Sequence, residues 1–402
     1  MIGIVSLNMR PHYGDTHAIV TVGRTCPIGS IAAGFFAQFF RFEPPSGGAV
    51  VRHPIQCIIP PYMLERLAQS ANVKVRDHAI TGLSQAAAVR AVRAFAQRVP
   101  GMMAVPSPAA TKNRLIYDAR KKDRLPGKLV RSEGEKKSAD VAVNEAYDFS
   151  GDTYDFYREV FGRNSLDDGG MTLISSVHVG ESDGSGKYQP MDNAFWDGGQ
   201  MAYGDGDGQI FKRFTRSLDV VAHELTHGVQ SFTSNLEYRG QSGAINEHFS
   251  DVFGVLVRQW RRGETAEKAS WLIGSEVLVA APTRRAIRDM ENPGTAYEND
   301  PDLGTDPQPF HMKNLYTGGA DNGGVHLNSG IPNRAFALAA KALGGNAWET
   351  AGRIWFDAML QLSRHSQFKD MASITVQIAG DSSRFGKDVK KVVQDAWKKV
   401  GL

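Results

Sequence analysis

Cysteine is almost absent from this chain, whose 402 residues include only Cys26 and Cys57. A protein stapled by several disulfides is therefore excluded, and everything beyond Cys57 has to fold without them. Long apolar runs are also lacking: no stretch of about 18 uncharged apolar residues occurs, so a membrane-spanning helix is not expected. An excess of one charge is missing too, because 46 basic and 43 acidic residues leave a net charge of +3. That balance argues against nucleic acid as the main partner.

The composition that remains is typical of folded proteins, with 42% hydrophobic and 22% charged residues. Residues 1–56 predict an N-terminal extension without a fold of its own, although the apolar stretch 28–40 has the length of a signal-peptide core. Consecutive prolines within 58–63 predict a rigid extended element. Residues 64–97, rich in alanine and arginine, predict a helix. Residues 99–110 carry several prolines and small side chains, which is typical of an exposed linker that proteases cut.

The rest of the chain divides by pattern into two parts. Residues 112–218 are rich in strand and turn signals, with a strand expected at 173–179 and one helix around 153–161. Helical periodicity dominates 219–402, and the lysine-rich tail 387–402 predicts an amphipathic helix with one solvated face. A β-rich part followed by an α-rich part predicts an α+β fold of two lobes with a cleft between them.

The main chemical signal is the segment 220–228, VVAHELTHG. His223 and His227 are four residues apart, so on a helix both imidazoles lie on one face and can reach the same metal ion. Glu224 would lie beside the open position of that metal rather than bind it. Because the pattern is short and can arise by chance, its context has to support it.

A second helix-like segment supplies that context. Glu247 lies twenty residues beyond His227, and Asp251 follows it by one helical turn. A catalytic zinc takes three protein ligands and keeps one position open, which two histidines and Glu247 would satisfy. Asp251 is placed to accept the second ring N–H of His223. His248 points away from the face of Glu247 and is interpreted as a packing residue.

Five motifs in order now make the chain resemble the thermolysin family of zinc metalloendopeptidases from about residue 112 onward. They are residues 175–178 (SSVH), 193–196 (NAFW), 203–209 (YGDGDGQ), 242–247 (SGAINE) and 321–330 (DNGGVHLNSG). Residues 58–64 (IIPPYML) further resemble the short propeptide of the protealysin branch. The resemblance implies a thermolysin-like catalytic domain, with lobes 112–218 and 219–402, preceded by a propeptide and cleavable linker over 57–111.

The resemblance also implies catalytic roles. Glu224 would act as general base toward a zinc-bound water and then pass the proton to the leaving amine. His326 and Tyr238 would donate hydrogen bonds to the oxyanion that develops on the cleaved carbonyl. Asp321 would orient His326 and keep it protonated.

Substrate contacts are implied in the same way. Asn193, the backbone of Ala194 and Arg288 would hold the peptide backbone of the substrate. An apolar pocket would favour a large hydrophobic residue directly after the cleaved bond. The positions that match this pocket are Phe211, Phe214, Val220, Ile273, Val277 and Ile287.

The chain departs from the family at the paired calcium site. Calcium takes six to eight oxygen ligands, and of the matching positions only Asp219 keeps a carboxylate. The other matching positions hold Arg258, Ser270, Leu272 and Ser275. We therefore expect the paired calcium site to be absent.

Cys57 directly precedes the proline-rich element and has two interpretations. A thiolate at the open position of zinc would displace the water and keep a precursor inactive. Alternatively, Cys57 is a buried or solvated thiol without a role, as lone cysteines usually are.

The sequence thus predicts a zinc-dependent endopeptidase, made as a zymogen, that cuts on the amino side of large hydrophobic residues. A zinc aminopeptidase is one alternative, although the glycine-methionine-glutamate-asparagine motif of that class is not found. A non-catalytic zinc-binding protein is the other, although it would need neither Glu224 nor His326. Expected partners are polypeptide substrates and the chain's own propeptide, with no nucleic acid and no membrane. The resemblance implies secretion, and a cytoplasmic location stays open because no clear signal peptide is visible.

Overall fold

The structure is a computed structural model that describes residues 56–96, 111–183 and 185–402. All of these residues belong to one compact unit of the chain. The predicted N-terminal extension, except for Gln56, and the predicted linker at 99–110 lie outside the described residues. None of the described helices is long and apolar enough to cross a membrane.

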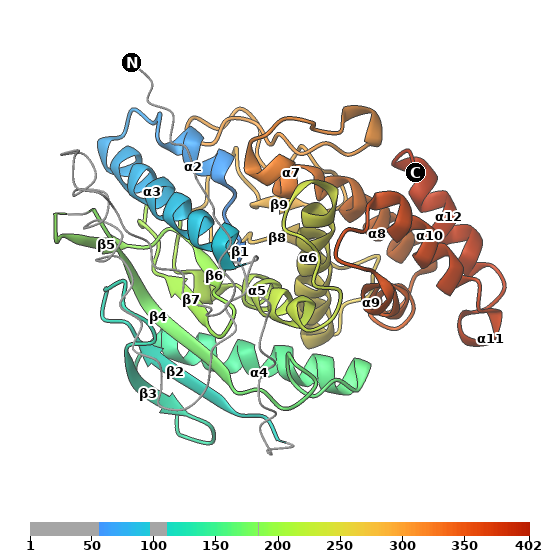
Figure 1. Cartoon of the computed structure of the whole chain (residues 1–402), viewed down its shortest axis with the longest axis horizontal. Coiled ribbons are helices and arrows are strands. Elements are labelled where there is room, and N and C mark those ends of the chain that lie inside the picture. The colour runs from blue at the N-terminus through green and yellow to red at the C-terminus, as the bar shows by residue number, and fades with distance from the viewer. Residues whose placement is uncertain (1–55, 97–110, 184) are drawn as a thin grey trace, which may run out of the picture. The chain divides into compact units, whose positions relative to one another are not determined.

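A seven-stranded mixed sheet forms the N-terminal part of the described chain, seen at the left of Figure 1. Strands β2, β4 and β7 run parallel to one another at its centre, whereas β1 pairs antiparallel with β6 at one edge. The strand order is β1-β6-β7-β4-β2-β3, with β5 paired to β4. The strands are β1 (Gln56–Cys57), β2 (Arg114–Asp118), β3 (Lys128–Ser132), β4 (Leu173–Ser182), β5 (Tyr188–Pro190), β6 (Ala194–Trp196) and β7 (Met201–Gly204), and a separate pair is formed by β8 (Leu272–Ile273) and β9 (Arg288–Asp289).

Helices make up most of the C-terminal part, and Figure 1 shows α8 to α12 gathered at the right of the view. The first three helices within the described residues are α2 (Pro61–Leu67), α3 (Val73–Ala96) and α4 (Val141–Phe161). The others are α5 (Leu218–Ser231), α6 (Gly240–Arg262), α7 (Asp321–Asn328), α8 (Gly330–Leu343), α9 (Ala351–Gln361), α10 (Phe368–Ala379), α11 (Ser382–Phe385) and α12 (Val389–Lys399). The strands of the large sheet come early in the chain and most of the helices follow them, which confirms the predicted α+β class.

Helices α5 and α6 lie between these two parts and pack closely against each other. Every residue of α5 from Leu218 to Gln230 is buried, which is the pattern of a helix that passes through a protein core. The absence of a side chain at Gly254 permits the contact, because a Cβ there would lie 2.6 Å from the carbonyl oxygen of Asp219. The two helices that carry the metal-ligand motif are therefore held rigidly at short range.

The N-terminal prediction needs two corrections. The extended element does not reach residue 63, because α2 begins at Pro61 with Pro60 as its N-cap. Proline is well accepted there, since its missing N–H is one that the first helical turn leaves unpaired anyway. The predicted helix 64–97 is in fact two helices, separated by a turn in which Ser70 Oγ accepts a hydrogen bond from the backbone N–H of Asn72.

From residue 111 onward, the structure confirms some of the predicted elements, changes the bounds of others and corrects one region. The helix expected around 153–161 begins at Val141, because Asp140 caps it by accepting the N–H of Ala142 at 2.8 Å. The strand predicted at 173–179 continues to Ser182. The region 263–320 holds no α-helix, although helical periodicity was expected to dominate there. The amphipathic tail helix is confirmed as α12, which buries Val393 and Trp397.

Candidate active site

Helix α5 brings two imidazoles together. His223 and His227 are both fully buried, and their Nε2 atoms lie 3.1 Å apart. Glu247 reaches the same point from α6, with Oε2 at 3.5 Å from His223 Nε2 and Oε1 at 3.5 Å from His227 Nε2. The candidate ligand atoms of the three residues all lie within 4.8 Å of one another.

This donor set fits a zinc ion. Two imidazole nitrogens and one carboxylate are a ligand set of catalytic zinc. Glu247 Oε2 is also a buried oxygen without a hydrogen-bond partner, which would be costly unless an ion lay beside it. Among the described residues, the histidine, cysteine and acidic side chains placed to share a metal ion are those of His223, His227 and Glu247.

The rings of both histidines are oriented by α6. Asp251 Oδ1 lies 2.9 Å from His223 Nδ1, which is the contact expected from the spacing. His227 Nδ1 lies 2.7 Å from Asn246 Oδ1 and 2.9 Å from Ser250 Oγ. With each Nδ1 held in this way, each Nε2 faces Glu247. Sequence reasoning missed Asn246 and Ser250, although both lie within one turn of Glu247 on the same helix.

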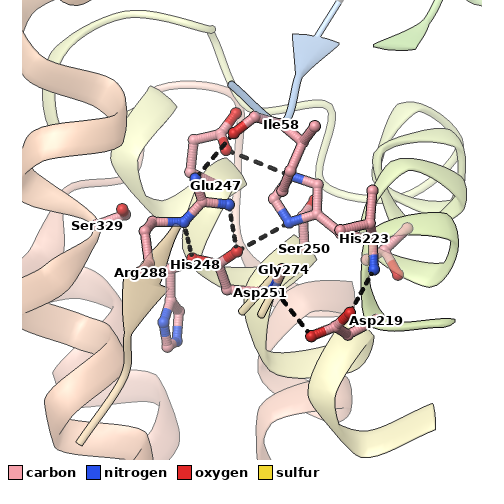
Figure 2. A network of polar contacts seen from close by, with 12 residues as sticks. Ile58, Asp219, His223, Glu247, His248, Ser250, Asp251, Gly274, Arg288 and Ser329 are labelled. Carbon is pink, nitrogen blue, oxygen red and sulfur yellow. Dashed lines mark hydrogen bonds and ion pairs between the residues drawn. The ribbon is translucent and has the colours of Figure 1, made fainter. Parts of the chain in front are cut away.

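Arg288, on β9, has a role in the site that the sequence did not indicate. Its side chain is fully buried and pairs with Asp251 through Nε and Nη2, at 2.9 and 2.7 Å. Figure 2 shows Asp251 between Arg288 and His223. Burial alone would raise the pKa of Asp251, but Arg288 and His223 outweigh it and hold that pKa below its usual range. For His223 the effects are reversed. Burial alone would lower its pKa, but the carboxylates of Asp251 and Glu247 outweigh burial and raise this pKa to about 9.

Glu224 lies buried beside the two histidines. Its Oε2 accepts a hydrogen bond from the backbone N–H of Trp196, on β6, at 3.2 Å. Its Oε1 is buried without a hydrogen-bond partner. Burial raises the pKa of Glu224 well above its ordinary value, and the positive charge of His223 only partly offsets this. A carboxylate in such surroundings has a strong tendency to take up a proton.

His326, on α7, completes the site from the other side. Asp321 Oδ1 lies 2.6 Å from His326 Nδ1, and Asp321 Oδ2 accepts the backbone N–H of His326 at 2.8 Å. Burial lowers the pKa of His326, but Glu247 and Asp321 outweigh it and raise this pKa. Tyr238 Oη lies 3.2 Å from His326 Nε2, and its hydroxyl donates to Glu247 Oε1. Tyr238 is thus near the position expected, and its hydroxyl contacts both His326 and Glu247.

The segment around residue 58 lies on the groups that were expected to hold substrate. Ile58 donates its N–H to the carbonyl of Ala194 at 3.3 Å, and its own carbonyl accepts from Arg288 Nη1 at 3.0 Å. The N–H of Ile59 donates to Asn193 Oδ1 at 3.1 Å.

The side chains expected to form the apolar pocket are all fully buried. They belong to the main hydrophobic cluster of the protein, and Ile58, also fully buried, belongs to the same cluster. The members are Phe211, Phe214, Val220, Ile273, Val277 and Ile287.

Cys57 reaches the site through its backbone. Its carbonyl oxygen lies 3.0 Å from His326 Nε2. In the described part of the chain, the group of candidate metal ligands consists of His223, His227 and Glu247 and does not include the Cys57 thiol.

At the positions that the resemblance matched to a paired calcium site, the guanidinium of Arg258 contacts the carboxylate of Asp219. Arg258 Nη1 pairs with Asp219 Oδ2 and also donates to the carbonyl of Leu272 at 2.8 Å. Its Nη2 donates to the carbonyl of Ser270 at 2.7 Å. Gly274 donates its backbone N–H to Asp219 Oδ2 at 3.1 Å, a contact that Figure 2 shows. Asp219 is therefore neutralised by a cation of the chain itself.

Comparison with known proteins agrees with this geometry. Residues 109–231 match the family model for the catalytic domain of thermolysin metallopeptidases, and residues 234–402 match the model for their alpha-helical domain. An extracellular metalloprotease of Pectobacterium carotovorum is 48% identical over 351 residues, which cover 87% of this chain and 97% of that protein. Protease PrtS of a Photorhabdus strain is 45% identical, covering 86% and 91%.

A solved structure is similar as well. The precursor of protealysin, a metalloproteinase from Serratia proteamaculans, superposes with a TM-score of 0.75 at 47% identity, covering 86% of this chain and 99% of that one. With both family models matched in order and the metal-ligand geometry in place, the chain belongs to the thermolysin family of metallopeptidases.

Proposed function

We propose that this metallopeptidase is a zinc-dependent endopeptidase made as a zymogen, which cuts peptide bonds on the amino side of large hydrophobic residues. The observation that carries this proposal is the position of Ile58. Its backbone is bound by Arg288 and Ala194, and the next N–H is bound by Asn193. These are the groups that a substrate backbone would use.

Bound by His223, His227 and Glu247, zinc would polarise the carbonyl of the substrate and lower the pKa of the attacking water. Glu224 takes a proton from that water and delivers it to the leaving nitrogen. Its raised pKa suits this task, because a base that has to release its proton again works best with a pKa nearer neutrality. The orphan Oε1 is the atom available for the transfer.

His326 stabilises the negative charge that develops on the carbonyl oxygen of the cleaved bond. Asp321 binds His326 Nδ1 and so directs Nε2 toward the substrate, and the raised pKa of His326 favours the protonated, donating form. A fixed donor in a buried site stabilises such charge more than water does. Tyr238 is close enough to act as a second donor if its hydroxyl turns from Glu247.

The preference for a hydrophobic residue is supported by burial. Ile58 follows the carbonyl that contacts His326, and its side chain is fully removed from solvent in the cluster that holds the six predicted pocket residues. Each methylene buried in such a pocket contributes about 1–3 kcal/mol of selectivity. Substrates with leucine, isoleucine or phenylalanine after the cleaved bond are therefore favoured over those with glycine or a charged residue.

Latency follows from the same contacts. Residues 57–59 occupy the backbone-binding groups of the site, so a substrate cannot use them in the precursor. Met63, Leu64 and Leu67 of α2 are buried in the main hydrophobic cluster and anchor the segment. Maturation is expected to require a cut within residues 99–112 and release of the preceding part. Because the relatives include an extracellular metalloprotease, we propose that the mature enzyme acts outside the cell.

The test is hydrolysis of casein and of a peptide blocked at both ends, with and without a zinc chelator. We expect both substrates to be cut by the matured protein and neither to be cut after chelation, with activity restored by zinc. A zinc aminopeptidase would leave the blocked peptide intact, and a non-catalytic zinc-binding protein would cut neither substrate. N-terminal sequencing of the matured form should place its start between residues 99 and 112.

A further inference from the structure

The peptide bond between Cys57 and Ile58 crosses the catalytic centre. The carbonyl oxygen of Cys57 lies 3.0 Å from His326 Nε2, the atom assigned to stabilise the oxyanion of a cleaved bond. On the other side of this bond, the N–H of Ile58 donates to the Ala194 carbonyl at 3.3 Å and its carbonyl accepts from Arg288 at 3.0 Å. Figure 2 shows Ile58 beside Glu247, with its carbonyl directed at Arg288.

Residues 57–59 run through the site in the direction proposed for a substrate, and not in the opposite direction. The carbonyl that meets His326 comes first, and a large hydrophobic residue follows it, as the proposed specificity requires. Strand β1 adds antiparallel to β6, with Cys57 opposite Phe195, so the bond is held in an extended conformation by the sheet edge. Edge-strand addition of this kind is a common way of presenting a peptide to a binding groove.

We propose that Cys57–Ile58 is itself a substrate bond, which the precursor hydrolyses within its own chain, separating residues 1–57 from residues 58–402. This inference rests on the proposed endopeptidase function. Water adds to the carbonyl carbon of Cys57, and the bond from that carbon to the nitrogen of Ile58 breaks. Glu224 moves one proton from the water to that nitrogen, which leaves as the new amino terminus. The remaining hydroxyl stays on the carbonyl carbon of Cys57, and its proton passes to the new amine, so that a carboxylate and an ammonium group result.

The cut leaves the enzyme latent. Ile58 and Ile59 are 0% and 1% exposed, and with Met63, Leu64 and Leu67 of α2 they remain packed in the main cluster. The backbone contacts of Ile58 to Arg288 and of Ile59 to Asn193 do not depend on the severed bond. The product is therefore a shortened precursor that begins at Ile58, distinct from the form matured by a cut at 99–112.

The test is made on the purified full-length precursor with zinc, by intact-mass analysis and N-terminal sequencing over time. A blocked peptide is assayed in parallel on the matured form. We expect a fragment ending at Cys57 and a product beginning at Ile58, formed at a rate that does not change on dilution. Ile58→Ala should slow the cut by about tenfold or more, because the buried side chain that follows the cleaved bond is shortened. Cys57→Ser should still be cut, because the reacting carbonyl remains.

Glu224→Gln serves as the control and should remain uncut. If the matured enzyme hydrolyses the blocked peptide but no precursor or processed species ever begins at Ile58, the inference is wrong while the proposed function stands. If the precursor is cut at Ile58 at a rate that rises with its concentration, the reaction runs between molecules and the proposal of a cut within the same chain is overturned. If neither reaction occurs, both the inference and the function fail.

Discussion

The carbonyl oxygen of Cys57 lies 3.0 Å from Nε2 of His326, although 269 residues separate the two in the chain. The sequence left two interpretations of Cys57 open, a thiol that binds the metal and keeps a precursor inactive, or a thiol without a role. In the structure, the pairing of β1 with β6 brings the backbone of this residue to the candidate catalytic centre. Under the proposed function, latency arises from occupied substrate contacts, which any residue with a carbonyl at position 57 would preserve.

The first prediction separates these two explanations of latency. In an uncut precursor, Cys57→Ser should hydrolyse a small blocked peptide no faster than the unsubstituted chain, because the carbonyl contact survives. Ile58→Asp should hydrolyse it several-fold faster, because a buried carboxylate is costly and weakens the docking of this segment. A clear gain of activity in Cys57→Ser alone would show that the thiol binds the metal.

The second prediction concerns the general base. Glu224→Gln keeps the size of the side chain and removes its ability to accept a proton. We expect the zinc content, measured by elemental analysis, to stay at one ion per chain while hydrolysis of casein falls by at least about a hundredfold. Substantial turnover by the zinc-loaded variant would contradict the role of Glu224.

The third prediction concerns Arg258 and Asp219, a buried pair with side chains 3% and 0% exposed. With zinc kept constant, addition of millimolar calcium should not raise the melting temperature of the matured protein, because Arg258 already neutralises Asp219. Arg258→Met should lower the free energy of unfolding by about 3–5 kcal/mol, because it leaves the carboxylate of Asp219 buried and unpaired.

The matched control for that pair is the double variant Arg258→Met with Asp219→Leu. Removing both charges should recover part of the lost free energy of unfolding, measured by denaturant titration of each variant in the Glu224→Gln background. A stabilisation by calcium in the unsubstituted protein would mean that the calcium site persists in another form.

The fourth prediction is a pH dependence of the docking of α3. This helix covers Glu181 on β4, since a Cβ on Gly82 would lie 3.7 Å from Glu181 Oε2. Burial, with the nearby charge of Asp192, raises the pKa of Glu181 to about 8. Burial also raises the pKa of Asp192, to about 6, and His78 on α3 lies 3.5 Å from its carboxylate, which raises the pKa of His78.

All three groups bind their protons more tightly while α3 is docked than when it is released. Docking is therefore fully favoured below the ordinary carboxyl pKa of about 4.5 and weakens as the pH rises toward 8. Hydrogen exchange of α3 in the Glu224→Gln precursor should show a smaller opening free energy at pH 8 than at pH 5. Glu181→Gln should flatten this dependence. Equal slopes in the two proteins would mean that Glu181 does not contribute.

Much of the candidate site could be inferred from local spacing. His223 and His227 on α5, and Glu247 and Asp251 on α6, follow from helical periodicity, because residues one turn apart share a face whatever surrounds them. The residues at which helices and strands begin and end were harder to infer from the sequence. Asp140 extends α4 backwards by a capping hydrogen bond, and the prolines at 60 and 61 start a helix instead of delaying it. Such ends depend on single side-chain contacts and not on periodicity.

Residue types and their spacing were enough to predict the chemistry of this protein: which side chains can hold zinc, which carboxylate can act as base, and that the positions matched to a calcium site around Asp219 carry no further carboxylate. Which groups meet depends on how the chain packs. Arg288 pairs with Asp251 while holding Ile58, Asn246 and Ser250 bind His227, and the carbonyl of Cys57 faces His326. Hydrogen bonds between the backbone of one segment and side chains far along the chain leave no periodic trace in the sequence. They arise only when the packing of α5 and α6 and the edge of the sheet bring those segments together.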